Sequence, residues 1–235
     1  MKKKFKFLVT KNITLDKKPS KKDVAIINKI WGDFIEVEGD LQCFLNYAIN
    51  GHTFKADLCD RNSSNYRGTY CFIIDIDNTY LYKEYDDALN KEINKTRVKT
   101  LEEGYLTPTG AIELLNGIGQ FNYGIYNTFS NTKEWNRFRI IVILDEPIFD
   151  REKRDSLYKA FSEIFKDDRS SSNYNKLFFG TRDDNFHLIK NKNYLKEEDL
   201  APFIQNSTSK TACKASINAP LKVINTNTPP ILSPI

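Results

Sequence analysis

The run Phe72-Ile73-Ile74-Asp75-Ile76-Asp77-Asn78 constrains the fold of this chain more than any other segment. Its apolar, β-branched residues predict a buried strand, and the two aspartates come at the end of that strand. Side chains on a strand alternate between its faces, so Asp75 and Asp77 point the same way. Two such carboxylates repel each other unless a cation lies between them, and Mg²⁺ or Mn²⁺ would suit their oxygen atoms. A buried strand that runs into a polar turn, without a metal, would look the same.

Composition narrows the class of protein. With 235 residues there is room for one large domain or two small modules. The 40% hydrophobic and 28% charged residues are typical of a soluble globular protein with a core. No stretch approaches the ~18 apolar residues that cross a bilayer, and no apolar region follows the basic N-terminus as in a signal peptide. The four cysteines form no CxxC pair, which favours reduced thiols in a cytoplasmic protein over zinc or disulfides.

Positive charge gathers at the N-terminus, although the net charge is only +4. The first 22 residues hold Lys2, Lys3, Lys4, Lys6, Lys11, Lys17, Lys18, Lys21 and Lys22. A basic segment of this kind fits a polyanionic partner such as nucleic acid. It fits an ordinary solvated surface equally well.

Periodicity and capping residues predict both helices and strands. Strands are expected over 4–14, 52–58, 69–76, 121–128, 137–144 and 177–180. Helices are expected from Ser20 through Phe34, over 41–49, from Thr107 or Thr109 through Leu115, and over 150–165. Residues 80–105 are charged and compatible with a helical insertion. Because there is no regular βαβ alternation, we expect an α+β fold with a mixed β-sheet and flanking helices.

Three segments, in order, carry a resemblance to a known family. The first is the strand that ends in Asp75 and Asp77, and the second runs from Tyr126 to Asp145 with an arginine-bearing strand at its end. The third is Asp168, followed by Lys176 and the aromatic strand 177–180. Their order and spacing resemble the archaeo-eukaryotic primase superfamily, in particular the primase-polymerase domains of plasmids and phages. The resemblance covers roughly residues 40–182.

This resemblance implies an RRM-like primase-polymerase core that performs metal-dependent nucleotidyl transfer, as a DNA primase or DNA-directed polymerase in plasmid or phage replication. It assigns Asp75, Asp77 and Asp168 as the catalytic ligands of Mg²⁺ or Mn²⁺, with Asp167 as the alternative third ligand. Two divalent ions about 3.5–4 Å apart can activate the attacking hydroxyl and hold the triphosphate. A solvated helix end is the alternative interpretation of Asp167 and Asp168.

The triphosphate needs cationic or hydroxyl donors. Arg137 and Arg139 are spaced i, i+2 and would share a face of their strand, where guanidinium groups can bind phosphate oxygens in pairs. Ser130 could add a hydroxyl, and Lys176 and Lys133 are weaker candidates. The family usually has a histidine where this chain has Asn131, which carries no charge. Either a nearby cation compensates, or nucleotide affinity is weak, or this copy is inactive.

The remaining expectations concern DNA contacts, histidines and domains. Template DNA is expected to meet the basic N-terminal segment, Lys55, Arg61 and Arg67. Neither histidine is expected to be catalytic: His52 precedes the strand that leads toward the site, and His187 is interpreted as structural. Residues 1–40 would be a basic strand and helix segment of the catalytic domain, 41–203 its core, and 204–235 a linker or tail rich in Ser, Thr, Asn and Pro. Expected partners are a single-stranded DNA template, a primer strand, dNTPs or NTPs, and a helicase domain beyond the C-terminus, with no membrane.

Two alternatives stay open. Residues 75–79 also match the DxDxT motif of haloacid-dehalogenase-type phosphatases, with Asp75 as nucleophile and Asp77 as acid and base. Thr128 and the pair Asp183-Asp184 would then complete that site, although this family expects the motif near the start of a regularly alternating α/β domain. The second alternative is a catalytically weak DNA-binding replication protein of the same fold, which the missing histidine motivates.

Overall fold

The computed structural model describes residues 3–29, 34–60, 65–166, 173–174 and 176–209. Within these residues the chain forms an α+β fold with five helices and three antiparallel sheets. The helices are α1 (Lys21–Lys29), α2 (Leu41–Ile49), α3 (Pro108–Ile118), α4 (Arg151–Phe165) and α5 (Glu197–Ser209). The strands are β1 (Phe5–Thr14), β2 (Phe34–Gly39), β3 (His52–Lys55), β4 (Asp57–Cys59), β5 (Tyr66–Ile76), β6 (Thr79–Asp86), β7 (Lys91–Val98), β8 (Tyr123–Asn127), β9 (Phe138–Ile148), β10 (Phe178–Phe179) and β11 (Phe186–Ile189).

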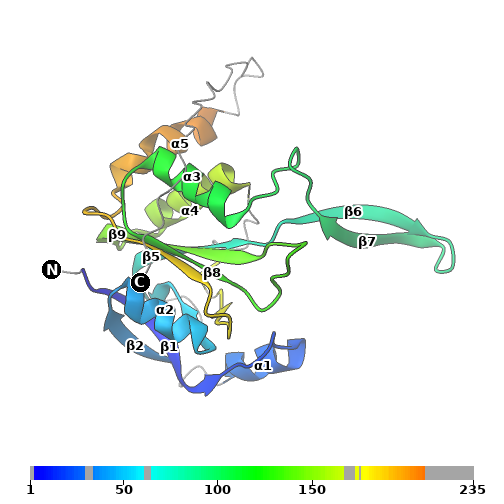
Figure 1. Ribbon diagram of the computed structural model, residues 1–235, viewed down its shortest axis with the longest axis horizontal. Coiled ribbons are helices and arrows are strands. Elements are labelled where there is room, and N and C mark those ends of the chain that lie inside the picture. The colour runs from blue at the N-terminus through cyan, green and yellow to red at the C-terminus, as the bar shows by residue number, and fades with distance from the viewer. Residues whose placement is uncertain (1–2, 30–33, 61–64, 167–172, 175, 210–235) are drawn as a thin grey trace, which may run out of the picture.

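The two larger sheets lie against each other in the body of the molecule. One has the strand order β11-β8-β9-β5-β4 and the other β10-β3-β1-β2. In Figure 1, α3, α4 and α5 cover one side of the five-stranded sheet, while α2 and the four-stranded sheet lie on its other side. The five-stranded sheet is therefore the central layer, and its middle strands β9 and β5 are buried on both faces.

The expected mixed sheet is wrong, because every pairing between named strands is antiparallel. A parallel pair needs a long crossover connection that returns the chain to the same end of the sheet. Here the loop 128–137 reverses the chain between β8 and β9, so these neighbours run in opposite directions. Among the described residues, parallel contact is limited to two isolated bridges that belong to no pair of named strands, Phe121 with Asn193 and Leu144 with Leu195.

Alternation along β5 divides the core into two parts. Phe72 and Ile74 pack with α3 and α4 on one face, whereas Cys71 and Ile73 pack with α2 and the four-stranded sheet on the other. Asp75 lies on the same face of β5 as Cys71 and Ile73, because side chains alternate along a strand. The carboxylate at the end of β5 therefore points to the side where the two sheets meet.

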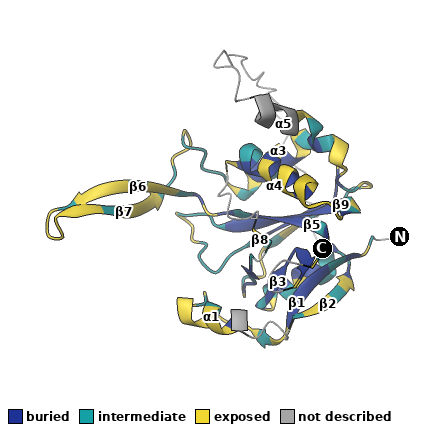
Figure 2. Cartoon of the chain, turned by 180° about the vertical axis from the view of Figure 1, so that it is seen from behind, coloured by how far each residue is buried: buried dark blue, intermediate teal, exposed yellow. Residues whose placement is uncertain are grey.

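Residues 79–98 form a two-stranded ribbon, β6–β7, and the expected helical insertion is wrong. Strand β6 carries Thr79 and three tyrosines, and β7 carries Ile93, Thr96 and Val98. These residue types favour extended backbone over helix. Cross-strand ion pairs join Lys83 to Glu92 at 3.0 Å and Lys95 to Glu84 at 2.7 Å. The ribbon projects from the body, and its residues are largely exposed (Figures 1 and 2).

The bounds of the other elements can be compared with those that the sequence predicted. The helices over 41–49 and 150–165 are confirmed, with Asp40 and Asp150 as N-caps, and Thr107 caps α3. The first helix begins after Ser20 as predicted, but Phe34 opens strand β2. The strand expected over 52–58 divides into β3 and β4.

The C-terminal boundary also differs from the prediction. The expected tail begins at residue 204, yet α5 continues to Ser209, and residues 210–235 lie outside the described residues. β11 was not predicted either; it adds to the edge of the five-stranded sheet. Of the helices in the described ranges, none has the length and apolarity that a bilayer crossing requires.

Candidate active site

A cleft of about 250 Å³ opens where the end of β5 meets loops from both sheets. Six of the side chains predicted from the sequence line it: Asp75, Asp77, Ser130, Arg137, Arg139 and Lys176. Thr128, which the phosphatase alternative would use, also lines the cleft, and the rest of the lining is Lys18, Pro19, Phe129, Leu177, Phe179 and Gly180. Segments that are far apart in the chain thus bring two carboxylates and four cations to one place.

Asp75 is held by Arg139 across the β5–β9 pair. The two residues are directly opposite in register, and Arg139 Nε donates to Asp75 Oδ1 at 2.9 Å. Lys176 Nζ lies 3.8 Å from the other carboxylate oxygen. The Asp75 side chain is 23% exposed, so it reaches the cleft although its charge is already compensated.

Arg139 is buried, and protein groups accept its hydrogen bonds. Besides Asp75, it donates to the Tyr126 hydroxyl at 3.3 Å and to the Phe179 carbonyl. Burial alone would lower the pKa of Arg139, but the charge of Asp75 and the Tyr126 hydroxyl raise it above its usual value. Burial also raises the pKa of Tyr126 to about 12, so that phenol stays neutral. Arg139 is therefore a fixed cation that orients Asp75, and its predicted contact with a triphosphate stays a prediction.

Asp77 faces the cleft more openly, with half of its side chain exposed. Arg137 Nε lies 3.0 Å from Asp77 Oδ1, but its N–H does not point at that oxygen, and Nε has no hydrogen-bond partner among the described residues. The pair is therefore an ion pair without a hydrogen bond. Thr79 donates its hydroxyl to the other carboxylate oxygen at 2.8 Å. Arg137 precedes β9 instead of lying in it, yet it lines the same cleft as Arg139.

Asn131 stabilises the loop that carries Arg137. Its side-chain Oδ1 accepts a hydrogen bond from the Arg137 backbone N–H at 2.9 Å, and its backbone N–H donates to the Thr128 carbonyl at 3.0 Å. Asn131 is not part of the cleft lining. Where the resemblance implies a nucleotide-binding histidine, this chain thus has a residue whose side-chain contact is with its own loop.

Two residues that sequence reasoning did not select support the carboxylates. Asn78 is buried in the left-handed region (φ 51°), donates to the Leu106 and Asn136 carbonyls at 2.7 Å, and accepts from the Leu106 N–H at 2.8 Å. Trp135 donates Nε1–H to the Asp77 carbonyl at 2.9 Å. The Asp-Asn dipeptide was a usable signal for Asn78, since asparagine tolerates this backbone region. Nothing local in the sequence pointed to Trp135.

Several other predicted residues lie elsewhere. Lys55 was expected to meet DNA, but this is wrong: its side chain is buried, Nζ donates to Cys59 Sγ at 3.2 Å, and burial lowers its pKa. Arg67 pairs with Glu36 at 2.7 Å. His52 contacts the Thr10 carbonyl at 2.8 Å, in keeping with a structural role, and His187 lies on β11. Lys133 is exposed and outside the cleft lining, while Arg61, Asp167 and Asp168 lie outside the described residues.

The carboxylates of the cleft could bind a divalent metal ion. Among the residues that the structure describes, no group of three His, Cys, Asp or Glu side chains is placed to hold an ion. Mg²⁺, however, is commonly bound through one or two carboxylates, with water and substrate phosphates completing its octahedron. Asp75 and Asp77 line one cleft and supply such a pair. The donor set therefore fits Mg²⁺ or Mn²⁺ bound together with a phosphorylated substrate.

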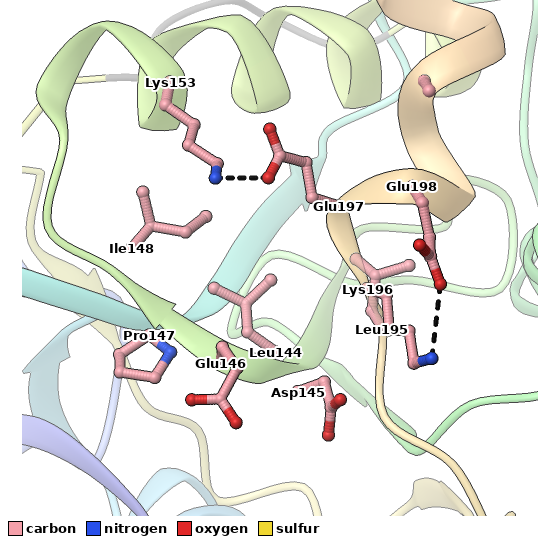
Figure 3. Close-up of a pocket in the computed structure, with 11 residues that line it drawn as sticks. Leu144, Asp145, Glu146, Pro147, Ile148, Lys153, Leu195, Lys196, Glu197 and Glu198 are labelled. Atoms are coloured by element: carbon pink, nitrogen blue, oxygen red, sulfur yellow. Dashed lines mark hydrogen bonds and ion pairs between the residues drawn. The ribbon is translucent and has the colours of Figure 1, made fainter.

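A larger cavity of about 640 Å³ lies away from this chemistry, between β9, α4 and α5 (Figure 3). Its lysines are paired within the cavity, Lys153 with Glu197 and Lys196 with Glu198. Both ion pairs are exposed at the surface, and such pairs contribute little. Size alone is a poor guide here, and the smaller cleft with its converging charges is the better candidate.

No protein-family model, curated protein or solved structure matches this chain.

Proposed function

We propose that this chain is a metal-dependent nucleotidyltransferase of the primase-polymerase type, which joins nucleotides on a single-stranded DNA template. The observation that carries the proposal is the convergence of Asp75 and Asp77 with Arg137, Arg139 and Lys176 in one cleft. Nucleotidyl transfer requires carboxylates for a divalent ion and cations for a triphosphate. The α+β architecture is compatible with the RRM-like core that the resemblance implies.

Each side chain has a definable part in this reaction. Asp75 and Asp77 would hold Mg²⁺ or Mn²⁺, which activates the attacking hydroxyl and neutralises phosphate charge when bound. Arg139 keeps the Asp75 carboxylate oriented by its hydrogen bond at 2.9 Å. Arg137 and Lys176 would bind the triphosphate, and Ser130 could donate its hydroxyl to a phosphate oxygen. Asp168 remains the proposed third metal ligand.

The template strand would enter over the basic N-terminal segment. Lys18 lines the cleft, and its exposed neighbours Lys17, Lys21 and Lys22 extend the positive surface along α1. Lysines that neutralise phosphates give affinity without sequence preference. The substrates would be dNTPs or NTPs with a primer strand, in the cytoplasm of a host that carries a plasmid or phage, and a helicase module would be the natural companion.

The two alternatives are less well supported. The phosphatase family has a regular α/β alternation, whereas the named strand pairs of this chain are antiparallel. Asp183, one of its expected metal ligands, accepts a hydrogen bond from the Asn127 side chain at 2.9 Å and lies outside the cleft lining. The DNA-binding protein without activity would explain the missing histidine. Against it, the cleft retains both carboxylates, which the binding of DNA phosphates does not need.

The test is an incorporation assay on single-stranded DNA, with and without a primer, using labelled dNTPs or NTPs and Mg²⁺ or Mn²⁺. We expect a product ladder that Asp75→Ala and Asp77→Ala abolish while DNA binding is nearly unchanged. Asp183→Ala is the matched control, because its carboxylate lies outside the cleft lining. Thermal melting of every variant separates loss of chemistry from loss of fold.

The outcomes divide the three candidate functions. A ladder that survives Asp75→Ala would contradict the catalytic assignment. Salt-sensitive DNA binding without incorporation would favour the non-enzymatic protein, and metal-dependent release of phosphate from a phosphoester would favour the phosphatase.

A further inference from the structure

The two arginines of the cleft differ in how much of their hydrogen-bonding capacity the protein uses. Arg139 donates to Asp75, Tyr126 and Phe179. Arg137 makes no side-chain hydrogen bond to any described residue, although a guanidinium carries five N–H donors. Within the described part of the chain, its charge is compensated by the ion pair with Asp77 at 3.0 Å. Among the described residues, Arg137 is therefore the arginine of the cleft that keeps more of its donors for a ligand.

Trp135 holds both members of that ion pair. The Arg137 guanidinium carbon lies 3.8 Å from the centre of the indole ring, and the indole N–H donates to the Asp77 carbonyl at 2.9 Å. A cation over the face of a tryptophan is attracted by the ring electrons, and tryptophan is the strongest partner of this kind. One side chain thus sets the place of the carboxylate's backbone and of the arginine's head group.

A divalent ion at Asp77 would compete with Arg137 for the same carboxylate. Asp77 could not compensate Arg137 fully while it also held a divalent ion, so the Arg137 ion pair would weaken while the tryptophan face still attracts the guanidinium. The stacked guanidinium would then stay in the cleft with N–H donors available for an anion that accompanies the metal. Planar guanidinium groups bind phosphate oxygens in pairs, which makes a triphosphate the fitting anion.

We propose that Trp135 is a positioning residue for nucleotide binding: it keeps Arg137 in the cleft as that arginine passes from Asp77 to the triphosphate of the metal-bound nucleotide. This inference rests on the proposed function, which supplies the metal and the triphosphate. It deepens that function by naming the arginine that recognises the nucleotide and the residue that aims it.

The first test uses fluorescence and needs no turnover. The chain has two tryptophans, so Trp31→Phe leaves Trp135 as the only one. Mg²⁺ together with a dNTP, without DNA, should change the Trp135 emission in a saturable way. The same titration with Arg137→Gln in the Trp31→Phe protein should lose that change. Emission that ignores both ligands, or that changes equally without Arg137, would overturn the inference.

The second test separates stacking from the N–H bond. Trp135→Leu removes both contacts, while Trp135→Phe keeps an aromatic face. Stacking of a cation on an aromatic ring corresponds to about 2- to 30-fold in affinity. We expect Trp135→Leu to raise the KM for nucleotide by about that factor with kcat largely retained, and Trp135→Phe to recover most of the loss. A fall in kcat alone, or equal effects of both variants, would contradict a role through Arg137.

The two tests also separate this inference from the proposed function. If the parent protein incorporates nucleotides but the emission of Trp135 is silent, the positioning role fails and the function stands. If the parent incorporates nothing but the emission responds to Mg²⁺ and dNTP through Arg137, the binding role stands and the polymerase proposal fails.

Discussion

At the scale of single residues, asparagines shape the cleft by bonding backbone groups. Asn78 ends the DxD strand in a left-handed conformation and ties it to two other segments through Leu106 and Asn136. Asn131 accepts the N–H of Arg137 and so sets the start of β9. An amide side chain suits both tasks because its oxygen accepts and its NH₂ group donates hydrogen bonds to backbone groups. Asparagine also tolerates the left-handed conformation of residue 78.

The role of Asn131 can be measured by stability. Asn131→Ala removes the acceptor for the Arg137 N–H, and we expect a loss of about 1 kcal/mol in the free energy of unfolding. Asn131→Asp keeps an acceptor oxygen at the same place and should lose less. Urea denaturation of both variants is the measurement. If Asn131→Asp is as destabilised as Asn131→Ala, the oxygen is not the group that matters.

At the scale of elements, the β6–β7 ribbon shows how cross-strand contacts stabilise a charged segment as two strands. Its cross-strand pairs join opposite charges, and Arg97 stacks on Tyr80 with 4.3 Å between the guanidinium carbon and the ring centre. A two-stranded ribbon is marginal by itself. Its base is held by Glu103, which accepts hydrogen bonds from Arg97 at 2.5 and 2.7 Å and from the Thr100 N–H at 2.9 Å.

This base is predicted to weaken in acid. The hydrogen bonds from Arg97, with help from the Thr100 backbone, lower the pKa of Glu103 to about 2. A lowered carboxyl pKa stabilises the folded form above the ordinary value near 4.5 and loses that contribution as the pH falls toward 2. An NMR titration of Glu103 should report the low pKa, and Arg97→Gln should return it toward the ordinary value. Lys83→Gln, farther along the ribbon, is the control that should leave it unchanged.

At the scale of the whole molecule, a buried ion pair joins the helical layer to the central sheet. Arg154 of α4 is completely buried, and its Nε donates to Asp57 of β4 at 3.0 Å. The Thr69 hydroxyl on β5 also donates to Asp57, and the rings of Tyr158 and Tyr174 lie 4.2 and 4.1 Å from the guanidinium carbon. This network lies toward the opposite end of β5 from Asp75, so the fold and the cleft have separate electrostatic anchors.

Breaking this anchor should destabilise the fold without changing the chemistry of the cleft. Arg154→Met leaves the Asp57 carboxylate buried without its main counter-ion, and we expect a loss of about 3–5 kcal/mol. Adding Asp57→Asn should recover part of that loss. Lys153 lies on the same helix as Arg154 and forms an exposed ion pair with Glu197 of α5. Lys153→Met, which breaks that pair, should cost less than about 1 kcal/mol. Denaturant unfolding compares the three, and similar losses for Arg154→Met and Lys153→Met would contradict the anchor.

The amino-acid sequence by itself determined the features that arise from near neighbours in the chain. Alternation from Phe72 to Ile76 predicted the buried strand that leads to Asp75 and Asp77, although β5 ends at Ile76 and Asp77 follows it. Ser20 and Thr107 were among the expected caps, and both accept the backbone hydrogen bond of a helix start. These signals are local, since a strand repeats every two residues and a cap bonds a backbone group three residues away. The order of the motifs was also sufficient to select six residues that line one cleft.

Only the tertiary structure decided which of those side chains bond to other protein groups and which have donors left for a ligand. Arg137 and Arg139 look alike in sequence, yet Arg139 is enclosed by β5, β8 and β10 while Arg137 rests on Trp135 beside the open cleft. Lys55 likewise looked like a surface cation until packing buried it beside Cys59. The physical reason is that burial and ion-pair partners come from segments far apart in the chain, and their contacts exist only once the two sheets have packed.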